Sequence, residues 1–164
     1  MTEPTPAATY ERARRLANVA LWTVDLQCRR LRNADEIDET FLFRLWADFD
    51  FLVIALTRLR RAVSLAGKAP ILAPPVAQAL AAFDAALPQL KKLRDTAEHI
   101  DDYAVDRGRV KSVKRQDLEV SSLTMEGPTL EWLGFRLNTE EALNASQALF
   151  ESLKGMSALL KRRA

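Results

Sequence analysis

Residues 38–65, with the sequence DETFLFRLWADFDFLVIALTRLRRAVSL, decide the fold of this chain. Apolar side chains recur along the stretch at alternating spacings of three and four residues, at Leu42, Leu45, Phe49, Leu52, Leu56, Leu59 and Val63. This spacing places every member on one face of a helix and is typical of helices that pack side by side in a bundle. We therefore predict a long helix with Asp38 as its N-cap and Gly67 as its stop.

The segments at the two ends of the chain carry the same periodicity. Residues 6–32 predict a first helix, whose apolar face is formed by Ala17, Leu21, Val24, Cys28 and Leu31. A last helix is expected to begin after Asn138 as N-cap, with Glu141 three residues on in the spacing of a capping box, and to continue to about Lys161.

Prolines interrupt the region between the second and last helices. A third helical segment follows Pro70, Pro74 and Pro75, and Pro88 lies inside it. Because proline removes a backbone donor and clashes with the preceding turn, the helix must kink there or restart. A restart would make Pro88 the first residue of a separate helix, which should end near Gly108.

Residues 118–137 break the helical pattern. Two β-prone stretches, 118–125 and 129–137, flank the turn signal Glu126-Gly127-Pro128, which predicts a small β-hairpin inserted before the last helix. The expected fold class is all-α, an up-and-down bundle of four or five helices that forms a single domain over residues 1–164.

Composition narrows the class of protein. Hydrophobic residues make up 48% and charged residues 28%, an ordinary globular balance, and a net charge of +2 is too small to imply nucleic-acid binding by itself. Cys28 is the only cysteine, which excludes an internal disulfide, and its place on an apolar face predicts a buried thiol. Without a signal peptide or an apolar run of about 18 residues, we expect a cytoplasmic protein with no membrane contact.

Residues 91–103, KKLRDTAEHIDDY, form the densest cluster of ionisable side chains and contain the only histidine, His99. Histidine is the side chain best suited to proton transfer near neutral pH. On one continuous helix the buried side would consist of Leu90, Leu93, Ala97, Ile100 and Ala104. Arg94 would lie at an edge of that side, and His99 would lie opposite with Tyr103, on the more exposed side. The simplest interpretation is a solvated, ion-paired helix face, as most exposed charge runs are.

The spacing of Arg94 and His99 resembles the Arg-x4–6-His motif of the HEPN superfamily, the higher eukaryote and prokaryote nucleotide-binding domains. Members are all-α bundles of about this size, and the catalytic ones are ribonucleases that use no metal or other cofactor. The resemblance implies that His99 is the base for the ribose 2′-hydroxyl, that Arg94 stabilises the phosphoryl transition state, and that Asp95 orients Arg94. It also implies a homodimer with a shared groove for RNA.

Neighbouring residues would support this site. Glu98 and Asp101, four and seven residues after Arg94, could pair with its guanidinium, and the neighbouring acids, Asp102 among them, could stabilise the charged form of the histidine. Tyr103 departs from the pattern of the toxin branch of the family, because it stands four positions after the histidine instead of two. That departure weakens its expected role.

The loop at residues 107–115, RGRVKSVKR, contains five cations and no acid: Arg107, Arg109, Lys111, Lys114 and Arg115. Beside a nuclease helix these cations would bind RNA phosphates, although a flexible surface loop explains them equally well. No aromatic residue is interleaved to stack bases. Arg58, Arg60 and Arg61 are instead expected to cap a helix end, where cations favour the dipole.

Two other functions remain open. A non-catalytic helical interaction or scaffold module would bind a cognate protein partner, with Trp22, Trp46 or Trp132 as an anchor; buried positions are expected for the last two. A single-metal site of Glu98, His99 and Asp102 comes third. One histidine cannot supply the paired motifs of a di-metal carboxylate bundle.

Overall fold

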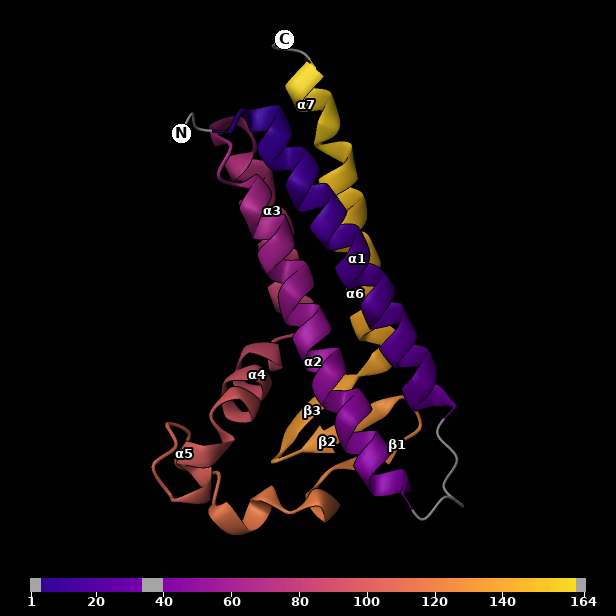
Figure 1. The fold of residues 1–164 in the computed structure, drawn as a ribbon, viewed down its shortest axis with the longest axis vertical. Coiled ribbons are helices and arrows are strands. Elements are labelled where there is room, and N and C mark those ends of the chain that lie inside the picture. Colours follow the sequence, from indigo (N-terminus) through magenta and orange to yellow (C-terminus); the bar gives the residue numbers. More distant parts are fainter. Residues whose placement is uncertain (1–3, 34–39, 162–164) are drawn as a thin grey trace.

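The structure, a computed structural model, describes residues 4–33 and 40–161. Its longest elements are α1 (Pro6–Arg32) and α2 (Phe41–Ala66), which run antiparallel and pack against each other along their length (Figure 1). The hydroxyl of Thr5 caps α1, and α2 stops at Gly67 as predicted. The predicted N-cap Asp38 lies outside the described residues.

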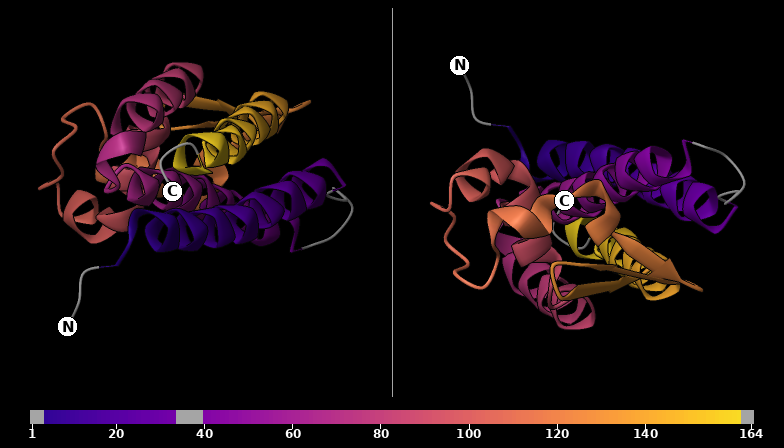
Figure 2. Two further views of the ribbon diagram at one scale, coloured as in Figure 1. Left: turned by 90° about the horizontal axis from the view of Figure 1, so that it is seen from above. Right: turned by 90° about the horizontal axis from the view of Figure 1, so that it is seen from below.

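The bundle is completed by α3 (Ala73–Ala86), which follows the short 3-10 turn Pro70–Leu72, and by α6 (Thr139–Gly155). Both pack on α2, and α6 also packs on α1. Figure 2 shows α1 at one edge of the molecule, with α3 across the bundle from it. The mostly helical bundle with a small β element is therefore confirmed.

The apolar face predicted for the second helix forms the core. Its members Leu45, Phe49, Leu52, Leu56, Leu59 and Val63 are buried. Leu42, in the first turn of α2, is the exception and is 44% exposed. On α1, Ala17, Val24, Cys28 and Leu31 are buried as expected, and Leu21 is half-buried.

The region of Pro88 forms a break between α3 and α4 (Leu90–Glu98), whose directions differ by 80°. A separate helix after the proline is confirmed, but Pro88 lies in the turn before it and Gln89 is its N-cap. The predicted end near Gly108 is wrong, because the helix breaks at His99 and the short α5 (Ile100–Ala104) follows. Among the described helices none alone is long and apolar enough to cross a membrane; only Pro70–Ala86 and Leu90–Glu98, taken together, meet that test.

The β element is a meander instead of one hairpin. Its strands are β1 (Thr124–Glu126), β2 (Thr129–Trp132) and β3 (Phe135–Asn138), paired antiparallel in that order. The second turn, Leu133-Gly134, has positive φ at both residues, as a tight two-residue hairpin requires. The expected strand from residue 118 is wrong at its start, because the chain forms 3-10 turns at Arg115–Leu118 and Val120–Ser122.

Aromatic rings attach this sheet to the bundle. The ring of Trp132 meets those of Trp46 and Phe49 edge to face, at centroid distances of 4.9 and 5.8 Å. Trp132 is fully buried as predicted, whereas Trp46, also predicted to be buried, is half-buried. The sheet is thus an integral part of the core at one end of α2.

The predicted N-cap of the last helix is confirmed. The side-chain oxygen of Asn138 accepts hydrogen bonds from the backbone N–H groups of Glu140 and Glu141, at 2.9 and 3.1 Å. The helix does not continue to Lys161 without a break, since α6 ends at Gly155 and α7 (Ser157–Lys161) follows.

Candidate functional site

Arg94 lies on α4 and is engaged by two acids of its own helix. Its Nε donates to Oδ1 of Asp95 at 3.0 Å, its Nη2 donates to the same oxygen, and its Nε lies 3.4 Å from Oε2 of Glu98. The predicted contacts of Arg94 with Asp95 and Glu98 are therefore present. They also offset the charge that a phosphoryl transition state would require from Arg94.

His99 forms the C-cap of α4 and leaves the helical conformation, with φ −123° and ψ 32°. Its side chain is 55% exposed, and Nδ1 lies 4.0 Å from Oδ2 of Asp102. The predicted exposure of His99 is confirmed. Asp102 at this distance is too far for a hydrogen bond, and no other described residue bonds to the ring, so its direction is not fixed as a general base needs.

The break at His99 rotates the residues that follow it. Tyr103, predicted on the exposed side with His99, is only 3% exposed, whereas Ile100 and Ala104, predicted to be buried, are exposed. The periodicity argument fails here because it assumed one continuous helix through residue 99. Tyr103 therefore belongs to the packing of this region and does not lie beside the imidazole.

Tyr103 holds the basic loop in place. A side chain at Gly108 would come within 2.1 Å of the tyrosine ring, so the loop backbone passes directly over it. The phenol oxygen accepts a hydrogen bond from the backbone N–H of Val110 at 3.2 Å. The loop is a folded connection and differs in this from the flexible segment that we considered.

The five cations of the loop differ in the contacts that they make. Lys111 donates to the carbonyl of Gly108 at 3.0 Å, and Arg115 lies 3.6 Å from Asp106. Of the five predicted phosphate ligands, Arg107, Arg109 and Lys114 are exposed and have no ion pair within the described part of the chain.

Glu98, His99 and Asp102 are not gathered into a metal site. Within residues 4–33 and 40–161, no group of three histidine, cysteine or acidic side chains has the geometry to hold an ion. The single-metal alternative is therefore not supported by the described residues. His99 and Asp102 approach each other only at the outer limit of an ion pair.

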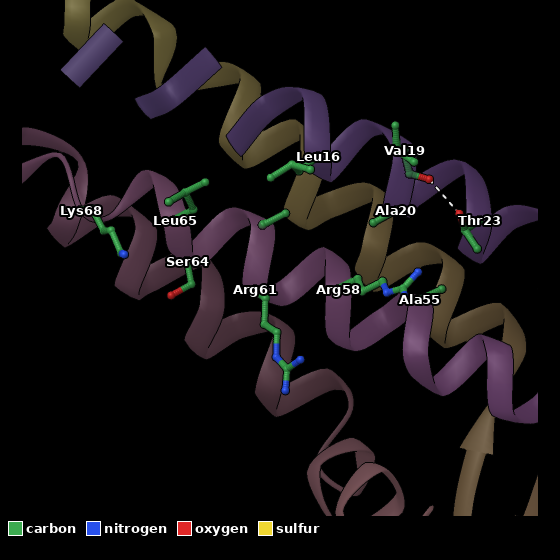
Figure 3. Close-up of a pocket in the computed structure, with 11 residues that line it drawn as sticks. Leu16, Val19, Ala20, Thr23, Ala55, Arg58, Arg61, Ser64, Leu65 and Lys68 are labelled. Carbon is green, nitrogen blue, oxygen red and sulfur yellow. Dashed lines mark hydrogen bonds between the residues drawn. The ribbon is translucent and has the colours of Figure 1, made fainter. Parts of the chain in front are cut away.

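The second candidate region is a surface groove, with no catalytic motif among the described residues that line it. A groove of about 660 Å³ runs between α1 and α2 (Figure 3). Its floor consists of the buried alanines Ala20, Ala55 and Ala62. Leu16 and Val19 line it from α1, and Leu65 lines it from α2. All the described residues that line the groove belong to α1, α2 or the turn after α2, and none belongs to α3 or α6.

The α1 edge of the groove is unusually apolar for a surface. Leu16 (55% exposed) and Val19 (66%) line the groove, and the exposed Trp22 (64%) and Leu26 (45%) follow on the same helix outside the lining. Single exposed apolar residues are common, but several together on one helix mark an interaction surface. The exposure of Trp22 fits the partner anchor that we considered for the interaction module.

The α2 edge of the groove carries Arg58, Arg61 and the nearby Lys68. None of the three forms an ion pair with any residue that the structure describes. Arg60, on another side of the same helix, donates to both carboxylate oxygens of Asp84 at 2.6 Å. The prediction that these arginines cap a helix end is wrong, because α2 continues to Ala66 and has no cation in its last turn.

The groove was missed by the search for catalytic motifs, although the sequence contains a signal for it. Residues 6–32 have a buried stripe, but the groove residues Leu16 and Val19 fall outside that stripe. A helix with apolar residues on two sides has either two covered sides or one that awaits a partner. Only the structure shows that the second side is open.

We compared the chain with protein-family models, with curated proteins and with solved structures, and found no match in any of the three. The resemblance to the HEPN superfamily is therefore still a prediction. Function has to be argued from the two regions described above.

Proposed function

We propose that this protein is a helical interaction module whose α1–α2 groove receives one helix of a partner protein. The observation that carries the proposal is a groove with a floor of alanines and an edge formed by the exposed Leu16 and Val19, after which the exposed Trp22 follows on α1. Exposed apolar side chains beside a groove favour the burial of an apolar partner. No chemistry by the groove itself is required.

The shape of the groove favours a helix as the occupant. Its lining on α2 runs from Ala55 to Leu65, about 15 Å of helix and nearly three turns. Alanines in the floor permit a third helix to approach at the 8–10 Å spacing found between packed helices. Such a partner would extend the bundle on its uncovered side, in the way that amphipathic helices bind hydrophobic grooves.

The apolar edge contains enough surface to support binding. Full burial of a leucine or valine side chain contributes about 1.5 to 3 kcal/mol, and tryptophan is among the residues that most often dominate interfaces. Leu16 and Val19 together would offset part of the cost of association, and Trp22 would add to this where the partner extends past Val19. We expect micromolar or tighter affinity for a well-matched helix.

The test is a selection from a displayed library of helical peptides about 20 residues long, each with one apolar stripe. Peptides that bind the wild-type protein should lose at least about 30-fold in affinity to the Val19→Glu variant. Val105→Glu is the matched control, since Val105 is equally apolar and exposed but lies after α5. Binding of these peptides should also shift the emission of Trp22, and Trp22→Phe should abolish that shift.

The proposal fails if the selection returns no peptide, or if the selected peptides bind Val19→Glu as well as the wild type. Circular dichroism of both glutamate variants checks that they remain folded. Because both positions are exposed, we expect little change in stability.

Ribonuclease action by Arg94, His99 and Asp95 in a homodimer stays a second proposal, supported by the motif and by the exposure of His99. It requires Arg94 to leave Asp95 and Glu98 on binding RNA. Purified protein incubated with a mixed RNA substrate tests it directly. Cleavage that His99→Ala abolishes would establish this activity, and on the present account we expect none.

A further inference from the structure

The two edges of the α1–α2 groove differ in chemistry. The α1 edge presents Leu16 and Val19 with Thr23, whose hydroxyl is already bonded to the carbonyl of Val19 at 2.9 Å. The α2 edge and the turn after it present three cations, Arg58, Arg61 and Lys68 (Figure 3). No acidic residue is among those that line the groove in the described chain.

We infer that the partner helix is acidic along one flank: its apolar stripe contacts α1 and the floor, and its carboxylates face Arg58, Arg61 and Lys68. This inference rests on the proposed function and specifies the occupant. The cations supply the argument, because the acids described in this chain leave them unpaired while Asp84 pairs with the adjacent Arg60. Complementary charge at a rim selects the partner and speeds its association.

The same face of a second copy is a poorer occupant. α1 carries six arginines but only two acids, Glu11 and Asp25. Both acids are already engaged, Glu11 by Arg14 and Arg15 and Asp25 by Arg29. The two hydrogen-bonded arginines hold the pKa of Glu11 at about 2, so it stays ionised and paired at neutral pH. Two such faces together would place cations against cations.

The spacing of the cations predicts the spacing of the carboxylates. Arg58 and Arg61 are about 4.5 Å apart along the axis of α2, and Lys68 lies in the turn beyond its end. On a partner helix, two acids three or four residues apart match the arginines, and a third two turns further matches the lysine. Three exposed pairs of this kind should tighten binding about tenfold.

The experiment repeats the peptide selection with the apolar stripe retained and the flanking positions encoded as equal mixtures of Glu, Gln and Lys. Glutamate should be enriched along one flank only. A synthetic peptide with glutamates there should bind about tenfold more tightly than its glutamine counterpart, and the difference should shrink at high salt. The double variant Arg58→Glu/Arg61→Glu should reverse the preference to lysine, whereas Arg109→Glu, at an unpaired arginine of the basic loop, should leave it unchanged.

The outcomes separate this inference from the proposed function. Peptides that bind equally well with Glu and Gln, or that prefer Lys, overturn the acidic flank but leave the groove as a helix site, provided that Val19→Glu still weakens them. A selection that returns nothing overturns both. Binding of the wild type to vesicles rich in anionic lipid, with a shift in Trp22 emission and no peptide selected, would identify a membrane surface as the occupant and also overturn the inference.

Discussion

The α1–α2 groove and the cluster of ionisable residues at 91–103, here called the α4–α5 patch, are the two regions where this protein departs from an ordinary helical surface. They differ in which charged and apolar side chains have no partner in the described chain. In the patch, Arg94 is paired with Asp95 and Glu98. In the groove, Arg58 and Arg61 form no ion pair with a described acid, and Val19 is exposed to water. The patch is rich in charge, but the groove has more interactions still to make.

This difference shows that a density of ionisable residues is weak evidence for a site. Exposed charges on a short helix can pair with one another within a turn, at little gain in stability and with nothing left for a ligand. The exposed apolar side chains and unpaired cations around the groove have no comparable partners among the described residues. The following experiments test whether the groove is open to a partner and whether the patch contributes to binding.

The largest effect should come from comparing thiols on the two sides of α1. Cys28 is fully buried, and its Sγ lies 3.4 Å from the carbonyl oxygen of Thr139. A cysteine at position 19, in Val19→Cys/Cys28→Ala, should react with a thiol reagent at least about 1,000-fold faster than native Cys28, which reacts only through opening of the structure. Comparable rates would show that the side of α1 facing the groove is covered, or that the side bearing Cys28 is open.

Filling the groove should have the next largest effect. Ala62→Phe places a ring in the floor and should weaken selected helical peptides by about 100-fold, because the partner can no longer reach the alanines. Arg94→Ala/His99→Ala, in the patch, should leave peptide affinity unchanged. The measurement is titration by Trp22 fluorescence. If the patch variant lost binding and the groove variant kept it, the binding site would be on α4 and the account would be wrong.

Alkaline pH should lower the stability of the protein, because Cys28 is buried on the covered side of α1. Burial raises the pKa of this thiol to about 11. Above pH 9 the thiol ionises in the unfolded chain but stays protonated in the folded one, so the unfolded state binds fewer protons and stability falls between about pH 9 and 11. Urea unfolding should show a loss of about 2 to 3 kcal/mol over this range that is absent in Cys28→Ala. Equal losses in both proteins would mean that another group causes the decline.

The smallest expected effect is the difference in stability between removing the paired Arg60 and removing the unpaired Arg58. Arg60→Ala removes the bidentate contact with Asp84 and should lower the free energy of unfolding by about 0.5 to 1 kcal/mol. Arg58→Ala should change it by less than about 0.5 kcal/mol, since it removes no contact with a described acid. Denaturant unfolding measures both. A larger loss for Arg58→Ala would mean that this cation has a structural role.

Most of the helical framework could be predicted from the sequence, because long helices repeat their apolar residues over many turns. The stripe from Leu45 to Val63 and the cap at Asn138 follow from local rules that the structure preserves. The second β-turn was harder to predict, since it places a leucine, Leu133, at positive φ, where a side chain is disfavoured.

The sites were less predictable for two physical reasons. His99 interrupts its own helix, so the faces assigned to Ile100 and Tyr103 were exchanged by a change of backbone conformation at one residue. The groove depends on which side of α1 stays uncovered, and that is set by the positions of α3 and α6, far along the chain. Periodicity shows that a helix has two apolar sides, but it does not show which side the fold covers.

The most direct test of the account is nuclear magnetic resonance of the isotope-labelled protein with a selected acidic-flanked peptide. We predict chemical-shift changes at Val19, Ala55 and Ala62, with none at residues 94–103. Changes confined to residues 94–103, with the groove signals unmoved, would contradict the claim that the α1–α2 groove is where this protein binds its partner.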